Sequence, residues 1–410
     1  MEPFKHVKVP AGGDPIQIEG GRMKVPDHLI IPSIEGDGIG LDITPATQRV
    51  LDAAVERCYS RRKLFWTEIF LGQKALPLYG ELLPEETLRA IRHFGVALKG
   101  PLTTPIGKGY RSLNVALRKA LDLYACVRPI KYIRGTPSPI RDPERVDVVI
   151  FRENTEDVYA GIEFEAGSPE AAKLRAFLAD NFNAVISEDS GIGVKPMSRR
   201  GTERLVRKAL QYAVRKKRRS VTLIHKGNIM KYTEGAFALW GYELARREFG
   251  ESIVTAEDAG AAGSRGAILF NDRIADNMLQ QILINPDQYD VLALPNLNGD
   301  YMSDLCAAMI GGLGLAPGSN IGDHLGVFEA THGTAPDIAG KNIANPSALV
   351  LSGALLLEHI GWEQAADLVR ATLEKTILKR QVTGDIAAQM WDPSALTTSE
   401  FAQAMIDNMK

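Results

Sequence analysis

The 410-residue sequence contains little cysteine, no long hydrophobic run and almost no net charge. Its three cysteines, Cys58, Cys126 and Cys306, are far apart in the chain and lack the spacing of metal ligands. This usage argues against a disulfide framework and against a cysteine zinc site. We therefore expect free thiols in a reducing, cytoplasmic setting.

Membrane and nucleic-acid signals are also missing. No apolar stretch approaches the roughly 20 residues of a transmembrane helix, and the first residues lack the charged-then-apolar pattern of a signal peptide. The 48 basic and 50 acidic residues leave a net charge of -2, which provides no basic field for nucleic acid. One short basic run, residues 215–219, follows a helical pattern, and we expect it to be a solvated helix end.

Short runs of β-branched residues alternate along the sequence with segments that have the apolar spacing of helices. This pattern is typical of an α/β protein, and the length suits two domains. Residues 28–34 are predicted to form a strand and residues 42–59 a helix. Between them, residues 36–40 read GDGIG, whose spacing differs from the dinucleotide fingerprint G-x-G-x-x-G. We expect a tight strand-to-helix turn here rather than a Rossmann loop.

One segment with helical apolar spacing carries a hydroxyl, a carboxamide and two guanidinium groups, and a third arginine follows the apolar run VDVVIF. These residues are Ser112, Asn114, Arg118, Arg128 and Arg152. The planar guanidinium group matches a carboxylate in bidentate fashion, so several arginines together suit a ligand with several carboxylates. For any one arginine alone, a solvated helix face or a surface ion pair remains the alternative.

Acidic and basic candidates follow further along the chain. Asp300 and Asp304 are four residues apart, and on one helix their β-carbons would lie roughly 5–6 Å apart. Mg²⁺ or Mn²⁺ suits such oxygen ligands, with Asp276 as a candidate third carboxylate. The alternative is that Asp300 caps the helix and Asp304 is solvated. Lys226 follows a strand-like run and suits proton transfer, although a surface lysine beside a turn would look the same.

Nearly the whole chain resembles the prokaryotic isocitrate dehydrogenases of the β-decarboxylating dehydrogenase family. The resemblance rests on long motifs in the family's order: IEGDGIG, KGPLTTP, SLNVALR, YACVRP, FRENTEDVYAGIE, HKGNIMKYTEG, NLNGDYMSD, APGSNIGD and FEATHGTAP. It implies an α/β fold of the isocitrate/isopropylmalate dehydrogenase type, without the G-x-G-x-x-G fold. The large domain would comprise residues 1–123 and 311–410, and the small domain residues 124–310. A clasp at about 157–197 would interlock two subunits of a homodimer.

The resemblance also implies roles for individual residues. The carboxylates of isocitrate would be held by Ser112, Asn114, Arg118, Arg128 and Arg152. Tyr159 would be the catalytic acid and Lys226 the base, and Mg²⁺ or Mn²⁺ would be bound by Asp276, Asp300 and Asp304. Lys226 and Asp276 would come from the partner subunit. The coenzyme would be contacted by Thr103, Asn228, His332, Gly333, Thr334, Asp337, Ile338 and Asn345.

The coenzyme itself is predicted to be NAD. NADP-using relatives follow HGTAP with Lys-Tyr and carry a tyrosine and an arginine further on, whereas this sequence has Asp337, Ile338, Gly384 and Ala388 at these positions. A carboxylate can accept hydrogen bonds from a ribose hydroxyl but repels a 2′-phosphate. Some relatives are regulated by a kinase, and a phosphate on Ser112 would repel the substrate.

Two alternatives stay open. A sibling enzyme acting on 3-isopropylmalate or homoisocitrate would keep the arginines and the metal ligands but change the pocket for the γ-substituent. A non-catalytic regulatory subunit belongs to a different functional class. The complete set of Tyr159, Lys226 and the three aspartates favours an enzyme.

Overall fold

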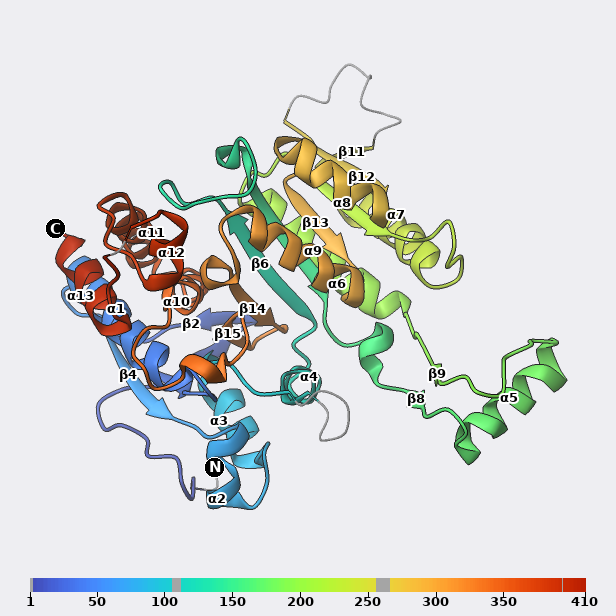
Figure 1. Ribbon diagram of the computed structural model, residues 1–410, viewed down its shortest axis with the longest axis horizontal. Coiled ribbons are helices and arrows are strands. Elements are labelled where there is room, and N and C mark those ends of the chain that lie inside the picture. Colours follow the sequence, from blue (N-terminus) through green and yellow to red (C-terminus); the bar gives the residue numbers. More distant parts are fainter. Residues whose placement is uncertain (1–2, 105–111, 256–265, 393) are drawn as a thin grey trace.

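The computed structural model of the chain describes residues 3–104, 112–255, 266–392 and 394–410. Within these residues an eleven-stranded sheet forms the centre of the molecule, flanked by helices (Figure 1). In spatial order its strands are β11 (Ile253–Thr255), β12 (Ile268–Ile274), β10 (Ser220–His225), β13 (Val291–Leu294), β7 (Asp147–Glu153), β6 (Ala125–Lys131), β14 (Pro317–Ile321), β15 (Gly326–Ala330), β5 (Val96–Lys99), β3 (His28–Ile34) and β4 (Lys63–Glu68). Two small hairpins pair β1 (Gln17–Glu19) with β2 (Arg22–Lys24) and β8 (Glu163–Phe164) with β9 (Ile192–Gly193).

The helices alternate with the strands along the chain, as the sequence pattern predicts. The α-helices are α1 (Gly40–Cys58), α2 (Leu76–Tyr79), α3 (Glu85–Phe94), α4 (Leu113–Ala120), α5 (Pro169–Phe182), α6 (Arg199–Arg215), α7 (Glu234–Phe249), α8 (Ala275–Ile284), α9 (Asn296–Met309), α10 (Ser347–His359), α11 (Glu363–Leu378), α12 (Gly384–Gln389) and α13 (Thr398–Asn408). Short 3-10 turns are η1 (Gly72–Lys74), η2 (Pro143–Arg145), η3 (Asp157–Ala160), η4 (Pro286–Gln288), η5 (Leu313–Leu315) and η6 (Pro336–Ile338). Among the described residues, none of the helices combines the length and the apolar character needed to cross a membrane.

The sheet has two parallel halves that run in opposite directions. Strands β11, β12, β10, β13 and β7 are parallel, as are β15, β5, β3 and β4, and the antiparallel strands β6 and β14 join the halves. The first half comes from the middle of the chain, and the second comes from both ends. Because β6 and β14 lie between the two halves, polar residues of both halves can meet around these strands.

Burial on both faces explains why these strands are so apolar. On β7, Val148 and Ile150 belong to the largest hydrophobic core, whereas Val149 and Phe151 belong to a second core on the other face. Alternate residues of a strand point to opposite faces, so both faces of β7 are covered by helices. A strand of this kind can bring a polar side chain into the interior at its carboxyl end, and β7 does so with Arg152.

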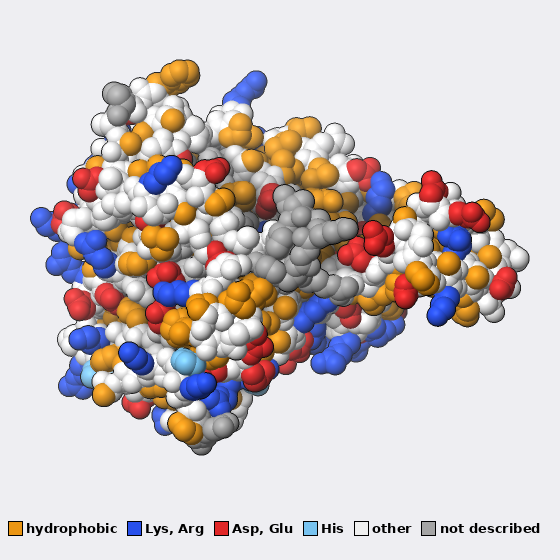
Figure 2. Space-filling view, turned by 60° about the horizontal axis from the view of Figure 1, so that its bottom comes forward, with side chains coloured by type: hydrophobic (Ala, Val, Ile, Leu, Met, Phe, Trp, Pro, Cys, Tyr) orange, Lys and Arg blue, Asp and Glu red, His pale blue; other side chains and the backbone are white. Residues whose placement is uncertain are grey.

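A projecting arm extends from the half of the sheet that contains β7. It consists of β8, α5 and β9, and Figures 1 and 2 show it protruding from the body of the molecule. Several large apolar side chains of the arm and its base are exposed: Ile162, Phe177, Phe182, Val185 and Val194. The arm falls within residues 157–197, the segment predicted to form a clasp.

The basic run at residues 215–219 is only partly the solvated helix end that we expected: Arg215, Lys217 and Arg219 are exposed, but the other two residues are paired with acids. Arg218 donates to Asp290 Oδ1 at 2.7 Å and to Asp147 Oδ1 at 2.9 Å. Lys216 forms an ion pair with Glu358 of α10 at 2.5 Å. The acidic partners come from distant parts of the sequence, and Asp290 is buried, so the run fastens the end of α6 to the sheet and to α10.

We predict that Asp290→Ala lowers the free energy of unfolding by about 3 kcal/mol, because it leaves Arg218 and the Arg219 N–H without their shared carboxylate. The matched control is Asp287→Ala. That carboxylate is half exposed in its pair with Arg145, so we expect a much smaller loss. Urea unfolding of both variants measures the difference, and equal losses would contradict a stabilising role for Asp290.

Candidate functional site

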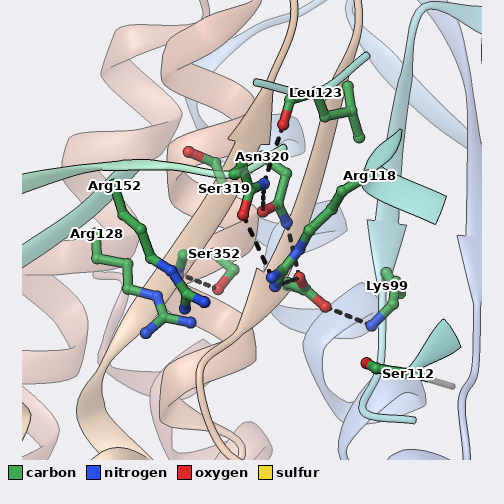
Figure 3. A network of polar contacts seen from close by, with 12 residues as sticks. Lys99, Ser112, Arg118, Leu123, Arg128, Arg152, Ser319, Asn320 and Ser352 are labelled. Carbon is green, nitrogen blue, oxygen red and sulfur yellow. Dashed lines mark hydrogen bonds and ion pairs between the residues drawn. The ribbon is translucent and has the colours of Figure 1, made fainter. Parts of the chain in front are cut away.

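Three arginines lie together in the interior of the protein. Arg118, Arg128 and Arg152 are 8%, 6% and 2% exposed. Cys126 of β6 lies opposite Arg152 of β7, and Arg128 is two residues further along β6, so both arginines point to the same face of the sheet. Figure 3 shows their guanidinium groups side by side. Burial lowers the pKa of Arg152, and the nearby Arg128 lowers it further. The solvated-arginine alternative is therefore wrong for all three.

The aspartates of α9 face two of these arginines. Arg152 donates to Asp300, and Arg128 Nη1 lies 3.8 Å from Asp300 Oδ1 and 3.7 Å from Asp304 Oδ1. Helix α9 begins four residues before Asp300, so this residue does not cap the helix. Burial raises the pKa of Asp300, but Arg152 and the Tyr159 hydroxyl bring it below its usual value. Burial also raises the pKa of Asp304, and because Arg128 offsets this effect only in part, the pKa stays above its usual value.

A buried ion cluster beside the arginines contains residues that we did not single out in the sequence. Glu329 of β15 accepts hydrogen bonds from Arg118 and Asn320, both at 2.7 Å, and forms an ion pair with Lys99 of β5 (Figure 3). Asn154 donates to Asn320 Oδ1 at 3.0 Å. Burial raises the pKa of Glu329, but Lys99 and Arg118 bring it well below its usual range. The signal in the sequence was a charged residue within an otherwise apolar strand, in VALK and in GVFEA.

Tyr159 points toward the same aspartate as Arg152. It lies on η3, and its hydroxyl donates to Asp300 Oδ2. The guanidinium carbon of Arg152 lies 4.8 Å from the centre of the tyrosine ring. Burial and the hydrogen bond to Asp300 raise the pKa of Tyr159 to about 12. The phenol is consequently protonated at neutral pH and can act as a proton donor.

A cavity of about 340 Å³ opens beside these groups. It brings together residues predicted for the substrate and for the coenzyme, and its lining includes Lys99, Thr103, Thr104, Asn114, Arg118, Arg128, Glu329, His332, Gly333 and Thr334. Within the described part of the chain, Asn114 Oδ1 is buried without a hydrogen-bond partner. Ser112 precedes α4, and its Oγ accepts from Thr104 Oγ1 at 3.3 Å. A polar ligand in the cavity would supply the partner that Asn114 lacks.

The glycine-rich turn at residues 36–40 supports one wall of this cavity. Asp37 accepts hydrogen bonds from the backbone N–H of Thr103 at 2.9 Å and of Gln73 at 3.1 Å. Gly38 has a left-handed backbone, with φ of +57°, and an added Cβ would lie 2.1 Å from the Thr334 carbonyl oxygen. The turn is thus a tight strand-to-helix connection, as predicted, and it positions two loops that line the cavity.

His332 has the hydrogen bonding expected of a ligand-binding group, whereas both ends of the Asn345 amide are bonded within the chain. Burial lowers the pKa of His332, so its ring is neutral at pH 7. Its Nδ1 lies 2.9 Å from the Gly333 carbonyl oxygen and must carry the proton, which leaves Nε2 as an acceptor. Asn345 Nδ2 donates to Asp385 at 3.0 Å, and its Oδ1 accepts from the Ser347 N–H. Asp337 and Ile338 lie on η6, with the aspartate exposed.

Lys226 and Asp276 pair with each other instead of joining the arginine group. They directly follow the paired ends of β10 and β12, and Lys226 Nζ lies 2.5 Å from Asp276 Oδ1. Within the described residues, no three His, Cys, Asp or Glu side chains are grouped so that they could hold a metal ion. One chain therefore does not bring Asp276 to Asp300 and Asp304. Asn228 is exposed on the turn after Lys226.

The chain matches the isocitrate/isopropylmalate dehydrogenase family over residues 30–405. It is 56% identical over 411 residues to "Isocitrate dehydrogenase [NADP]" of Archaeoglobus fulgidus, with 99% of each chain covered. It is 51% identical over 419 residues to the protein of the same name from Pseudomonas aeruginosa, covering 99% of this chain and 100% of the relative. A crystal structure of isocitrate dehydrogenase from Methylococcus capsulatus is similar, with a TM-score of 0.77 and 39% identity over 93% of this chain and 99% of that one.

These names contradict the predicted preference for NAD. The relatives that match along almost the whole chain at 50–56% identity are named for NADP. The prediction relied on four positions, Asp337, Ile338, Gly384 and Ala388. Coenzyme choice is a difference between two binding free energies to which the whole pocket contributes, so four side chains were too small a basis.

We predict that Gly38→Ala destabilises the protein and weakens coenzyme binding, because the new Cβ would displace the Thr334 carbonyl that lines the cavity. Gly80→Ala is the matched control, since Gly80 also has a positive φ, of +75°, but open space around it. Backbone strain alone should cost about 1 kcal/mol in both variants, with a larger loss for Gly38→Ala. Thermal unfolding and coenzyme titration measure the two effects. Equal behaviour of the two variants would show that the contact with Thr334 is unimportant.

Proposed function

The chain belongs to the isocitrate/isopropylmalate dehydrogenase family, and we propose that it catalyses the oxidative decarboxylation of isocitrate to 2-oxoglutarate and CO₂, with NADP as hydride acceptor. The observation that carries the proposal is the grouping of three buried arginines: Arg118 and Arg128 line the cavity, and Arg128 and Arg152 pair with the aspartates of α9. Bidentate guanidinium groups suit a substrate with several carboxylates.

The charge of the site supports a tricarboxylate bound with a divalent cation. Among the described residues, the three arginines and Lys99 form ion pairs with Asp300, Asp304 and Glu329. A substrate with three carboxylates can bind to these cations, and a divalent cation can bind to the aspartates. Such pairing matters here because unpaired buried charge is strongly unfavourable.

The polar end of the cavity favours isocitrate over 3-isopropylmalate. Ser112 and Asn114 stand at the start of α4, beside Arg118, where the side chain that distinguishes the two substrates would lie. A carboxylate can accept hydrogen bonds from these groups, whereas an isopropyl group would leave them unpaired.

Asp300 and Asp304, with Asp276 of a second chain, would hold the divalent cation. Carboxylate oxygens suit Mg²⁺ or Mn²⁺, and when bound such an ion lowers the pKa of the substrate hydroxyl and withdraws electrons during decarboxylation. Arg128 already lies between the two aspartates, so their mutual repulsion is reduced before any ligand arrives.

Tyr159 and Lys226 would transfer the protons. Tyr159 is protonated at neutral pH and lies against Asp300, so it can protonate the carbon from which CO₂ departs. As a neutral amine, Lys226 can accept the proton of the substrate hydroxyl and become an ammonium group. Its Nζ lies beside Asp276 in an outward-facing pair, so both groups can enter the site of a neighbouring chain together.

We further propose that the active unit is a homodimer. The exposed apolar side chains of the arm have the character of an interface. Other exposed apolar side chains occur on α7, α8 and α9, and they include Leu239, Leu283, Ile284 and Tyr301. Lys226 lies on the turn between β10 and α7, and Asp276 lies on α8, so both residues would reach the partner's site from this half of the sheet.

The coenzyme would occupy the part of the cavity lined by Thr103, His332, Gly333 and Thr334. His332 Nε2 offers an acceptor to an adenine amino group, and Asn345 is held by its two hydrogen bonds. The support for NADP comes from the names of the relatives, since Asp337 and Ile338 provide no positive charge for a 2′-phosphate.

Ser112 is a candidate site of regulation, because a phosphate would place roughly two negative charges where a substrate carboxylate binds. Ser112→Asp should accordingly abolish isocitrate binding, whereas Ser112→Ala should retain much of it. Isothermal titration of isocitrate into both variants distinguishes them, and normal binding by Ser112→Asp would refute the idea.

The reaction is tested by following coenzyme reduction with isocitrate and Mg²⁺, and then with 3-isopropylmalate or homoisocitrate in its place. We expect turnover with isocitrate, loss of turnover with a chelator and a higher kcat/KM with NADP than with NAD. Turnover with one of the other substrates alone would favour the sibling enzyme. No turnover with any of them would favour a regulatory subunit.

We predict that Tyr159→Phe lowers kcat by a factor of about 10² to 10⁴ and changes the KM for isocitrate little, because the phenol acts in proton transfer more than in binding. Tyr132→Phe is the matched control, since it removes a hydroxyl bonded to the Thr136 carbonyl outside the cavity. Steady-state kinetics of both variants are compared with the wild type. A Tyr159→Phe enzyme with normal kcat and a raised KM would exclude the acid role.

A further inference from the structure

Lys195, where the arm returns to the body of the protein, lies between two buried carboxylates. Its ammonium group forms ion pairs with Asp157 and, at 2.9 Å, with Glu234 Oε1. The side chains of both acids are 1% exposed, and that of Lys195 is 17% exposed. The two acids belong to segments far apart in the sequence, so the lysine joins two separate elements. Without it, their like charges would repel each other.

Asp157 connects the lysine to the turn of Tyr159 and to the helix that carries the aspartates. Its Oδ2 accepts from the Leu297 N–H at 3.0 Å, at the beginning of α9 and three residues before Asp300. Asp157 is also the first residue of η3, two residues before Tyr159, and its φ of +67° is uncommon for a side chain other than glycine. The contacts of the carboxylate hold this backbone in place.

Glu234 connects the same lysine to the turn of Lys226. Its Oε2 accepts from the Lys226 N–H and, at 2.8 Å, from Asn298 Nδ2 of α9. Glu234 is completely buried at the start of α7. One ammonium group is thus linked through two carboxylates to the turn of Tyr159, the turn of Lys226 and the first turn of α9.

We propose that Lys195 is a positioning residue for the reaction, which ties the proton donor, the proton acceptor and the aspartate helix of one chain into one rigid unit. The proposal rests on the function proposed above. In the homodimer Tyr159 would serve the site of its own chain and Lys226 the site of the partner, so Lys195 would connect two active sites. It also ties the root of the arm to the catalytic residues, so formation of the dimer and alignment of the site depend on the same side chain.

Removing the ammonium group has a defined consequence. Asp157 and Glu234 would then face each other without a cation between them, and the two turns would separate. A displacement of about 1 Å at a reacting group can lower turnover by a factor of about 10². The arginines that bind the carboxylates of the substrate do not contact Lys195, so the loss should fall on kcat rather than on the KM for isocitrate.

The test uses full-length Lys195→Met, with Lys131→Met as the control, since Lys131 forms an exposed ion pair with Asp147. We expect Lys195→Met to lower kcat at least about tenfold, with the KM for isocitrate within a few-fold of the wild type. Lys195→Arg, which keeps a cation between the two acids, should recover most of the loss. Light scattering records the oligomeric state of each variant.

A second variant separates the effect of Lys195 on the position of the catalytic groups from its effect on the stability of the fold. Lys195→Met/Glu234→Gln removes one positive and one negative charge, so its unfolding temperature should return toward the wild-type value while its kcat stays low. It also keeps the proposal testable if Lys195→Met does not fold. Wild-type kcat in either variant would overturn the positioning role. Lack of isocitrate turnover by the wild-type enzyme would instead overturn the proposed function.

Discussion

Buried positive charge is the constraint on which the rest of the structure depends. Arg118, Arg128, Arg152 and Lys99 lie within one region of the interior, and each has a carboxylate within ion-pair distance. Isolated buried charges are strongly unfavourable, so the strands and the helix that carry these residues must be brought next to the elements that carry the acids.

The arrangement of the sheet meets this constraint. Its two parallel halves run in opposite directions, and β6 and β14 lie where they join. Strand β7 contributes an arginine at its carboxyl end, β5 and β15 contribute the lysine and glutamate of the buried cluster, and β6 crosses between them with Arg128. A catalytic site built on strands and on the first turns of helices is held more rigidly than one on loops, which suits chemistry that needs close alignment.

Much of the site could be predicted from the sequence, because its motifs are local. The arginines, Tyr159, Asp300 and Asp304 come together as expected. Lys99 and Glu329 were missed because they are 230 residues apart, and their pairing depends on the neighbouring positions of β5 and β15. The ion pairs of the basic run were missed for the same reason, since the acids that bind Arg218 come from other parts of the chain. The prediction of NAD was wrong because the charge at Asp337 does not determine by itself which of the two coenzymes the whole pocket binds more tightly.

The central claim is that one chain holds an incomplete site and that two chains complete it. It is tested most directly by mixing two inactive variants, Tyr159→Phe and Lys226→Met, under conditions in which subunits exchange. A mixed dimer would contain one site with both residues intact and one with neither, so random exchange should restore roughly a quarter of the wild-type activity. If Lys226 served its own chain, every site in the mixture would lack one residue. Activity that stays at the level of the separate variants, after exchange has been verified, would contradict the account.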